Sequence, residues 1–185
     1  MAVQNVLAQD PTSFEALFQD GLMNLAKSKA AQAIREFEYL SNIYHGSAKV
    51  RYQLARAYLL YAKDANATDS RAAVDNADSR LSEAIKLNPH FEEAVELFAD
   101  IKIHKAAAAA AVDPLMELIK GRPQETKAYY LLASAYSAQQ RTDQALAVYR
   151  RTAELFPRDP QPRFLIGTIL LSQNQPLEAR KAFEK

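Results

Sequence analysis

Histidine and carboxylate side chains are the residues of this chain that could perform acid–base chemistry or bind a metal. The three histidines, His45, His90 and His104, are too widely spaced for a metal-ligand motif. One acidic cluster has the spacing of a single helix face, and it consists of Glu92, Glu93, Glu96 and Asp100. This cluster could hold a cation or supply an acid and a base. No further ligand or partner base accompanies it, so a solvated acidic helix face is the favoured interpretation.

Other signatures of catalysis are missing from the sequence. The chain contains no Cys, and its 4 Gly are far apart. None of the glycine-rich nucleotide-binding motifs occurs, nor do the HExxH or GxSxG motifs of zinc proteases and serine hydrolases. We therefore expect no enzyme, no cofactor and no metal site.

The charge balance restricts the class of partner. The 185 residues include 23 Lys and Arg against 22 Asp and Glu, which gives no overall attraction to nucleic acid or anionic lipid. Residues 120–185 are locally basic, with 11 Lys and Arg against 6 Asp and Glu. An acidic partner is possible there, although solvated basic helix faces are the ordinary explanation. Aromatic residues do not interleave with this basic set, so we expect no nucleic acid partner.

Membrane insertion is not expected either. No apolar run of this sequence approaches the roughly 20 residues that a bilayer-spanning helix needs. We therefore expect no direct membrane insertion in this segment. The compartment stays open between periplasm and cytoplasm, because the absence of Cys does not assign one.

A repeated spacing of small residues predicts how these side chains are positioned. A Gly or Ala is followed by a second Ala, and four residues later by a bulky side chain, in five places along the chain. The triplets are Gly21/Ala33/Phe37, Ala55/Ala77/Leu81, Ala99/Ala111/Leu115, Ala133/Ala145/Tyr149 and Gly167/Ala179/Phe183. Small residues let two helices approach closely, and bulky neighbours fill the remaining space. Proline follows at Pro89, Pro123 and Pro157, where it would end the second helix of each hairpin.

The spacing divides the chain into stacked helical hairpins and predicts an all-α fold. The predicted units are 14–47, 48–91 with a ten-residue insertion, 92–125, 126–159 and a truncated 160–185, preceded by the tail of another unit at 1–13. One hairpin cannot bury its apolar face alone, so the units share a continuous core. We expect a single array of four full units with partial units at both ends. We interpret the chain as a fragment of a longer protein.

The pattern resembles the tetratricopeptide repeat (TPR) family, whose period is about 34 residues. The best match is 126–159, where the signature positions hold Tyr129, Leu132, Ala133, Tyr136, Ala145, Tyr149 and Pro157. The resemblance implies a solenoid of helical hairpins wound into a right-handed superhelix. Departures occur where Asp20 and Asn24 replace apolar residues, and where Arg51 and Arg163 replace a large aromatic side chain.

Two irregularities interrupt the repeat. The segment 63–69 is polar, so we expect a lengthened hairpin whose second helix is capped by Thr68, Asp69 or Ser70. A docking role for its tip is possible, but a tolerated insertion at an exposed turn is favoured. Pro114 either kinks the second helix of its unit or begins it after Asp113. The phase of Ala111 favours the kink.

The resemblance also implies a binding surface. In the TPR family, the first helix of each hairpin lines a concave face through regularly spaced positions. The candidate groove residues at these positions are Phe18, Leu22, Tyr52, Arg56, Leu59, Glu96, Asp100, Tyr130, Ser134, Phe164 and Leu171. Spaced aromatics and few charges suit an extended or helical peptide. Glu96 and Asp100 interrupt the apolar track, so we expect a ligand with apolar anchors around a central basic residue.

The sequence therefore predicts a protein-interaction scaffold that binds a peptide segment or a partner domain in its concave groove. It does not resemble the TPR modules that clamp the C terminus of heat-shock chaperones, because those use Lys and Asn where this chain has Phe18 and Leu22. One alternative is an assembly module of the bacterial cell envelope, since the units from 126 onward are diffusely similar to exopolysaccharide-export and secretion TPR proteins. Another is a regulatory arm of an enzyme whose catalytic domain lies outside this chain.

Overall fold

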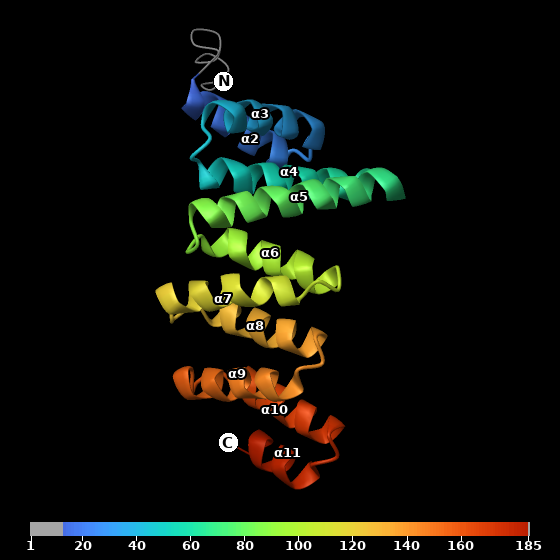
Figure 1. Ribbon diagram of the computed structural model, residues 1–185, viewed down its shortest axis with the longest axis vertical. Helices are drawn as coiled ribbons and strands as arrows, with labels where there is room; N and C mark the ends of the chain where they lie inside the picture. Colours follow the sequence, from blue (N-terminus) through green and yellow to red (C-terminus); the bar gives the residue numbers. More distant parts are fainter. Residues whose placement is uncertain (1–12, 185) are drawn as a thin grey trace. The chain divides into compact units, whose positions relative to one another are not determined.

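The computed structural model describes residues 13–184, which contain ten α-helices and no β-strand (Figure 1). The prediction of an all-α fold is therefore confirmed. The helices belong to two compact units, residues 1–94 and 95–185. The predicted tail at 1–13 lies outside the described residues except for Ser13. No helix of the described part combines the length and the apolar character needed to cross a membrane.

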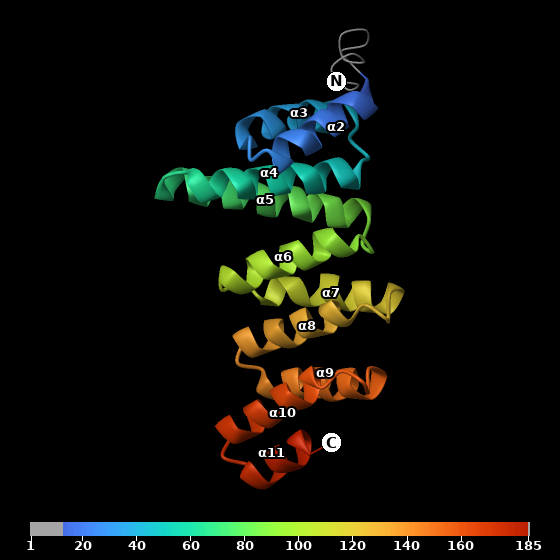
Figure 2. The same ribbon diagram turned by 180° about the vertical axis from the view of Figure 1, so that it is seen from behind.

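The first unit consists of two helical hairpins, visible from both sides in Figures 1 and 2. Its helices are Phe14–Ala26 (α2), Ala30–Ile43 (α3), Ala48–Asp64 (α4) and Ala67–Leu87 (α5). The largest side chains of its core are completely buried, and they include Phe37, Leu40, Leu54 and Leu81. Complete burial of one such side chain contributes about 1.5–3 kcal/mol to stability, so apolar packing holds these hairpins together.

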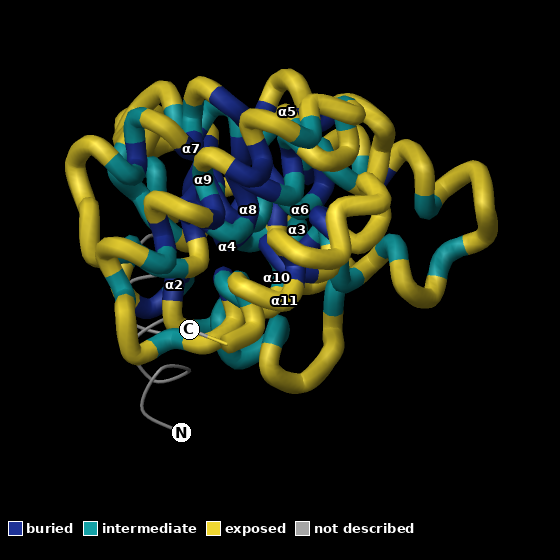
Figure 3. The backbone as a smooth tube through the Cα atoms, turned by 90° about the horizontal axis from the view of Figure 1, so that it is seen from below, coloured by how far each residue is buried: buried dark blue, intermediate teal, exposed yellow. Residues whose placement is uncertain are grey.

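The second unit continues the same pattern. Its helices are Glu92–His104 (α6), which begins within the first unit, Ala109–Gly121 (α7), Thr126–Ala138 (α8), Thr142–Leu155 (α9), Gln161–Ser172 (α10) and Pro176–Phe183 (α11). One core cluster joins α8 to α11 through Ala133, Ala145, Tyr149, Ile166 and Ala179. Nearly all buried positions lie on the helices, and most residues of the turns between them are exposed or half-buried (Figure 3).

The predicted small positions lie where the two helices of a hairpin meet. A Cβ atom placed on Gly21 would come within 2.6 Å of the Phe37 ring, and one on Gly167 within 2.3 Å of the Phe183 ring. Where the first helix carries Ala instead of Gly, the bulky partner is Leu or Tyr. At these two positions the absence of a side chain leaves space for a phenylalanine ring of the second helix.

Four of the hairpins close with the same turn. Its central residue has a left-handed backbone, with φ of 57° at Ser28, 54° at Ala106, 60° at Gln140 and 59° at Asn174. In the α6–α7 turn, the Ala106 N–H donates to Ile103 O at 3.3 Å and the Ala107 N–H donates to Lys102 O at 2.8 Å. This is the Schellman pattern, which satisfies the last carbonyl groups of the first helix.

The α4–α5 hairpin closes differently and is longer than the other hairpins. Its helices have 17 and 21 residues and extend beyond the α2–α3 turn (Figure 1). The lengthened hairpin agrees with the sequence-based expectation, but the predicted cap does not. The side chain of Asn66 accepts hydrogen bonds from the backbone N–H groups of Thr68 at 3.1 Å and Asp69 at 3.0 Å. Asn66 caps α5 because its side-chain carbonyl reaches both groups from the position just before the helix.

The α7 helix runs through Pro114, as the phase of Ala111 predicts. Ala111 is completely buried at its repeat position. The N-cap residue is Ala108, so Asp113 does not begin the helix. The packing of Ala111 requires that α7 start before the proline.

Candidate binding surfaces

The candidate groove residues of α2 and α4 differ in how accessible they are. Phe18 is only 5% exposed, because its ring stacks on Phe14 at 5.6 Å and meets the Phe37 ring edge-on at 5.7 Å. Leu22 and Leu59 are half-buried. Phe18 therefore belongs to the core of the first unit, and Leu22 and Leu59 offer only part of their surface to a ligand.

Tyr52 lies beside an open groove of the first unit. Its ring lies 5.1 Å from that of Phe91, and the Arg56 guanidinium lies 5.8 Å from the Tyr52 ring centre. The groove has a volume of about 510 Å³, and its walls come from the start of α4 and the segment after α5. They include Lys49, Tyr52, Gln53, Asn88 and Phe91. An aromatic pair beside a cation and amide groups is a surface that could hold an apolar peptide side chain.

Glu96 of the second unit is not available as a free carboxylate. Its side chain is only 10% exposed, and Lys127 Nζ lies 2.7 Å from Glu96 Oε2. The hydrogen bond that Lys127 donates to Glu96 raises the pKa of Lys127, and the negative charges of Glu96, Asp100 and Glu125 reinforce this effect. Lys127 remains charged at neutral pH. A basic residue of a ligand would therefore compete with Lys127 for this carboxylate.

Tyr130 is held in place by its hydroxyl group. The hydroxyl donates a hydrogen bond to Asp159 Oδ2 at 2.6 Å, and the ring lies 6.2 Å from that of Tyr149. Burial, and then the hydrogen bond to Asp159, raises the pKa of Tyr130. Ser134, one turn along α8, is half-buried. The ring of Tyr130 is accessible in part, but its polar end is already occupied.

The candidate residues of α10 are both exposed. Phe164 is 60% exposed and Leu171 is 52% exposed. The Phe164 ring lies 6.0 Å from that of Phe183 on α11. Equivalent repeat positions therefore range from a buried core ring, at Phe18, to an open aromatic surface at Phe164.

The two arginines that replace the family's aromatic residue have a common structural role. Each donates to a backbone carbonyl six residues earlier, and Tyr129 does the same from the equivalent position. The distances are 3.4 Å from Arg51 Nη2 to His45 O, 3.1 Å from Tyr129 Oη to Pro123 O, and 3.0 Å from Arg163 Nη1 to Pro157 O. The guanidinium group therefore replaces the tyrosine hydroxyl in holding the connection between two hairpins.

Asp20 and Asn24, the other departures from the family pattern, also have a local explanation. Asn24 Nδ2 donates to Glu36 Oε1 at 2.9 Å, from α2 to α3. Burial raises the pKa of Glu36 to about 7, and the neighbouring Asp20 carboxyl group reinforces the shift. These polar residues form a titratable contact between the two helices.

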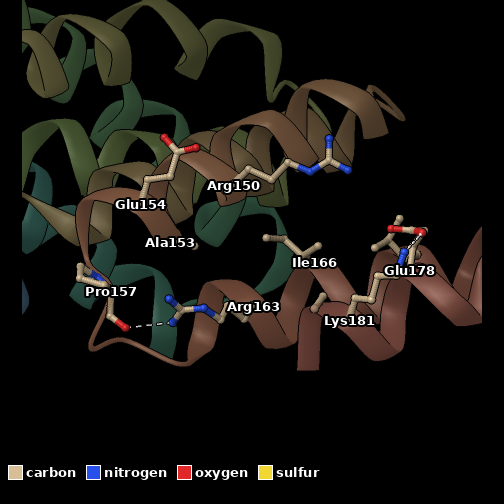
Figure 4. A pocket seen from close by; sticks show the side chains of 10 residues that line it. Arg150, Ala153, Glu154, Pro157, Arg163, Ile166, Glu178 and Lys181 are labelled. Atoms are coloured by element: carbon tan, nitrogen blue, oxygen red, sulfur yellow. Dashed lines mark hydrogen bonds and ion pairs between the residues drawn. The ribbon is translucent and has the colours of Figure 1, made fainter. Parts of the chain in front are cut away.

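Two further grooves lie between consecutive second helices of the hairpins, and the candidate set does not include them. One, between α7, α8 and α9, has a volume of about 370 Å³ and mostly apolar walls that include Met116, Ile119, Leu132 and Val148. The other, between α9, α10 and α11, has a volume of about 560 Å³ and charged walls (Figure 4). The basic composition of 120–185 was a signal for the second groove, but composition alone could not locate a cleft.

Comparison with known families agrees with this architecture. A sequence model of the tetratricopeptide repeat matches residues 73–160 and 130–185. Together these matches cover more than half of the chain, which therefore belongs to the tetratricopeptide repeat family.

Several solved structures have a similar fold. A crystal structure of MamA is 20% identical, with a TM-score of 0.72 over 89% of this chain and 90% of that chain. MamA from Desulfovibrio magneticus RS-1 is 15% identical, with a TM-score of 0.72 over 92% and 90%. A thermophilic TPR protein of Thermus thermophilus is 20% identical, with a TM-score of 0.63 over 91% and 87%. At these identities, the similarity shows that this chain has the TPR-type helical-hairpin fold.

Proposed function

We propose that this chain is a protein-interaction scaffold rather than an enzyme, and that it binds a peptide segment or a partner domain on the first helices of its hairpins. The family membership and the hairpin fold support a scaffold, because stacked repeats present extended surfaces for binding.

The groove beside Tyr52 carries this proposal. Tyr52 and Phe91 supply an aromatic wall, while Lys49 offers a donor to a peptide backbone. Tyrosine is enriched among the residues that dominate protein interfaces, because its ring provides a large rigid contact area and its hydroxyl can bond at the rim. A ligand side chain that packs against Tyr52 and Phe91 would be apolar.

In the second unit, Tyr130 and Phe164 are the corresponding anchors. They lie on α8 and α10, and Leu171 extends the apolar surface along α10. Ser134 on α8 could bond to a peptide group beside these rings. A ligand of this unit would therefore contribute apolar side chains, while Lys127 remains bound to Glu96.

A quantitative pulldown from the source organism tests the proposal. The Tyr52→Ala/Tyr130→Ala variant should lose the specific partners of the unmodified protein, because truncation of an aromatic anchor costs about 2 kcal/mol or more, roughly 30-fold in affinity. The control is Tyr61→Ala, which removes a tyrosine that is 39% exposed on the same α4 helix but outside the groove. Circular dichroism establishes that both variants are folded. Equal recovery of partners by all three proteins would refute the proposal.

A further inference from the structure

The charged groove between α9, α10 and α11 has cations at both of its ends. Arg163 extends toward Pro157 at one end, whereas Arg150 extends in the opposite direction, toward α11 (Figure 4). Lys181 and Glu178 lie on α11 and are 2.8 Å apart at their charged atoms. We call this groove, lined by residues of 150–182, the C-terminal cleft.

Two of the cations have no carboxylate partner in the described part of the chain. Arg163 donates only to backbone carbonyls, at 3.0 Å to Pro157 O and 3.4 Å to Asp159 O. Arg150 is exposed and forms no ion pair within residues 13–184. Glu154, which could have neutralised Arg150, lies 3.2 Å from Arg151 instead. The cleft therefore keeps two guanidinium groups able to bind an anion.

The wall between these cations is apolar. Ile166 and Leu170 follow Arg163 at one-turn intervals along α10, and Ala153 and Ala182 face them from α9 and α11. The volume of about 560 Å³ is in the range of small-ligand and peptide side-chain pockets. A fitting ligand would place an apolar side chain against Ile166 and negative charges near both ends.

We propose that the C-terminal cleft binds an acidic segment of a partner protein, in which Asp or Glu residues flank an apolar side chain. One carboxylate pairs with Arg163 and another with Arg150, because a planar guanidinium matches a carboxylate with two parallel hydrogen bonds. The apolar side chain packs on Ile166 and Leu170. Glu154 and Glu178 in the walls repel a continuous polyanion, which disfavours nucleic acid in the same place.

This site shares no lining residue with the groove beside Tyr52, which carries the proposed function, so the two proposals can be tested independently. The probe is a library of random dodecapeptides displayed on phage. Their C termini are fused to the coat protein, so every carboxylate of a selected peptide belongs to an Asp or Glu side chain. Selection on the unmodified protein should enrich peptides with Asp or Glu on both sides of Leu, Ile, Met or Phe. Those peptides should bind the Tyr52→Ala variant with unchanged affinity.

Charge variants then connect the selected peptides to the cleft. Arg150→Gln should weaken their binding about tenfold in fluorescence anisotropy, and increasing salt should weaken it further. Arg150 forms no ion pair in the described chain, so this variant should keep its fold. Arg180→Gln is the matched control, because it removes the same charge from α11 outside the cleft. Its affinity should stay within about twofold of the unmodified protein.

A gain of affinity gives the proposal a second readout. Glu178→Gln removes a repulsive carboxylate and releases Lys181, so it should tighten peptide binding about threefold. Selected peptides without acidic residues, or acidic peptides insensitive to Arg150→Gln, would overturn the proposal. Preferential binding of a single-stranded oligonucleotide that is lost in Arg150→Gln would assign the cleft to nucleic acid and refute the proposal.

Discussion

Arg51 and Arg163 occupy the same position of the repeat and hold equivalent backbone carbonyls, yet their surroundings differ. Arg51 is 8% exposed, pairs with Glu83 at 2.7 Å and also donates to Ser41. In the register of Arg163, the position of Ser41 is taken by Ala153. The guanidinium of Arg163 consequently lines an open cleft. A single repeat position can therefore serve stability in one unit and recognition in another, depending on the neighbouring side chains.

The largest expected effect is the difference in stability loss between the variants that lack the Arg51 or the Arg163 guanidinium group. Arg51→Ala should lower the free energy of unfolding by about 2–3 kcal/mol, because it leaves the buried Ser41 without its partner and removes the ion pair with the partly exposed Glu83. Arg163→Ala should lower it by only about 1 kcal/mol, because it loses hydrogen bonds at a partly exposed site. Urea denaturation of both variants measures the two values. Equal losses would show that the two arginines do not differ in role.

The two glycines extend the same comparison to apolar packing. Gly21→Ala should lower the free energy of unfolding by about 1–3 kcal/mol, because the fully buried Phe37 ring cannot move away from the new methyl group. Gly167→Ala should be neutral or stabilising by up to about 1 kcal/mol. There the opposing Phe183 is 45% exposed and can rotate, and Ala favours the helix.

A second substitution tests whether ring contact is the cause of this loss. The Gly21→Ala/Phe37→Leu variant recreates the Ala55/Leu81 pair of the next hairpin. It should be more stable than the sum of its two single variants predicts, by about 1 kcal/mol in a double-mutant cycle. Strict additivity would mean that the clash with Phe37 does not limit the Gly21 position.

The contact between α2 and α3 should make the stability of the protein depend on pH, because it contains the titratable Glu36. The pKa of Glu36 is raised from 4.5 to about 7, so the folded state favours the protonated carboxyl group. Stability from this group is therefore complete below about pH 4.5 and is lost as the pH rises to about 7. Glu36→Gln should remove that loss and stabilise the protein at pH 8 by about 1 kcal/mol, after allowance for solvent screening. Thermal unfolding at pH 4.5 and pH 8 checks this; a pH profile unchanged in Glu36→Gln would contradict it.

The smallest expected effect concerns two equivalent turns. Ala106→Gly should stabilise the protein by about 0.5 kcal/mol, because a left-handed backbone costs Ala about 1–2 kcal/mol and the greater freedom of unfolded Gly offsets part of the gain. Asn174→Gly should change stability less, because Asn tolerates this conformation. Chemical denaturation of the two variants at one temperature measures both effects. A larger stabilisation by Asn174→Gly than by Ala106→Gly would contradict this explanation.

The spacing of small residues was sufficient to predict the hairpins, because a helix pair can approach closely only where Gly21 or Ala33 lacks a large side chain. The phase of Ala111 likewise placed Pro114 inside a helix. The cap at Asn66 was less predictable, because several neighbouring residues could have accepted the same hydrogen bonds. Asn66 is the cap because it is the last residue of the turn, directly before the first residue of α5.

Accessibility at the candidate site could not be predicted from repeat position alone. Phe18 and Phe164 occupy the same position of the repeat. Phe14 and Phe37 cover the Phe18 ring, whereas the Phe164 ring is exposed. The same limit applies to Glu96, whose partner Lys127 lies on another helix. Which side chains are free to meet a ligand is decided by contacts between residues far apart in sequence.

The length of the α4–α5 hairpin has a consequence for how the chain comes apart. Helix formation is cooperative, so helices of 17 and 21 residues resist fraying better than the 8-residue α11. In a stack of hairpins each element depends mainly on its neighbours, and opening can proceed one element at a time. Amide hydrogen exchange should therefore be fastest in α11 and slowest where α4 and α5 bury Leu54 and Leu81. Loss of structure would begin at the C-terminal cleft and reach the long hairpin last.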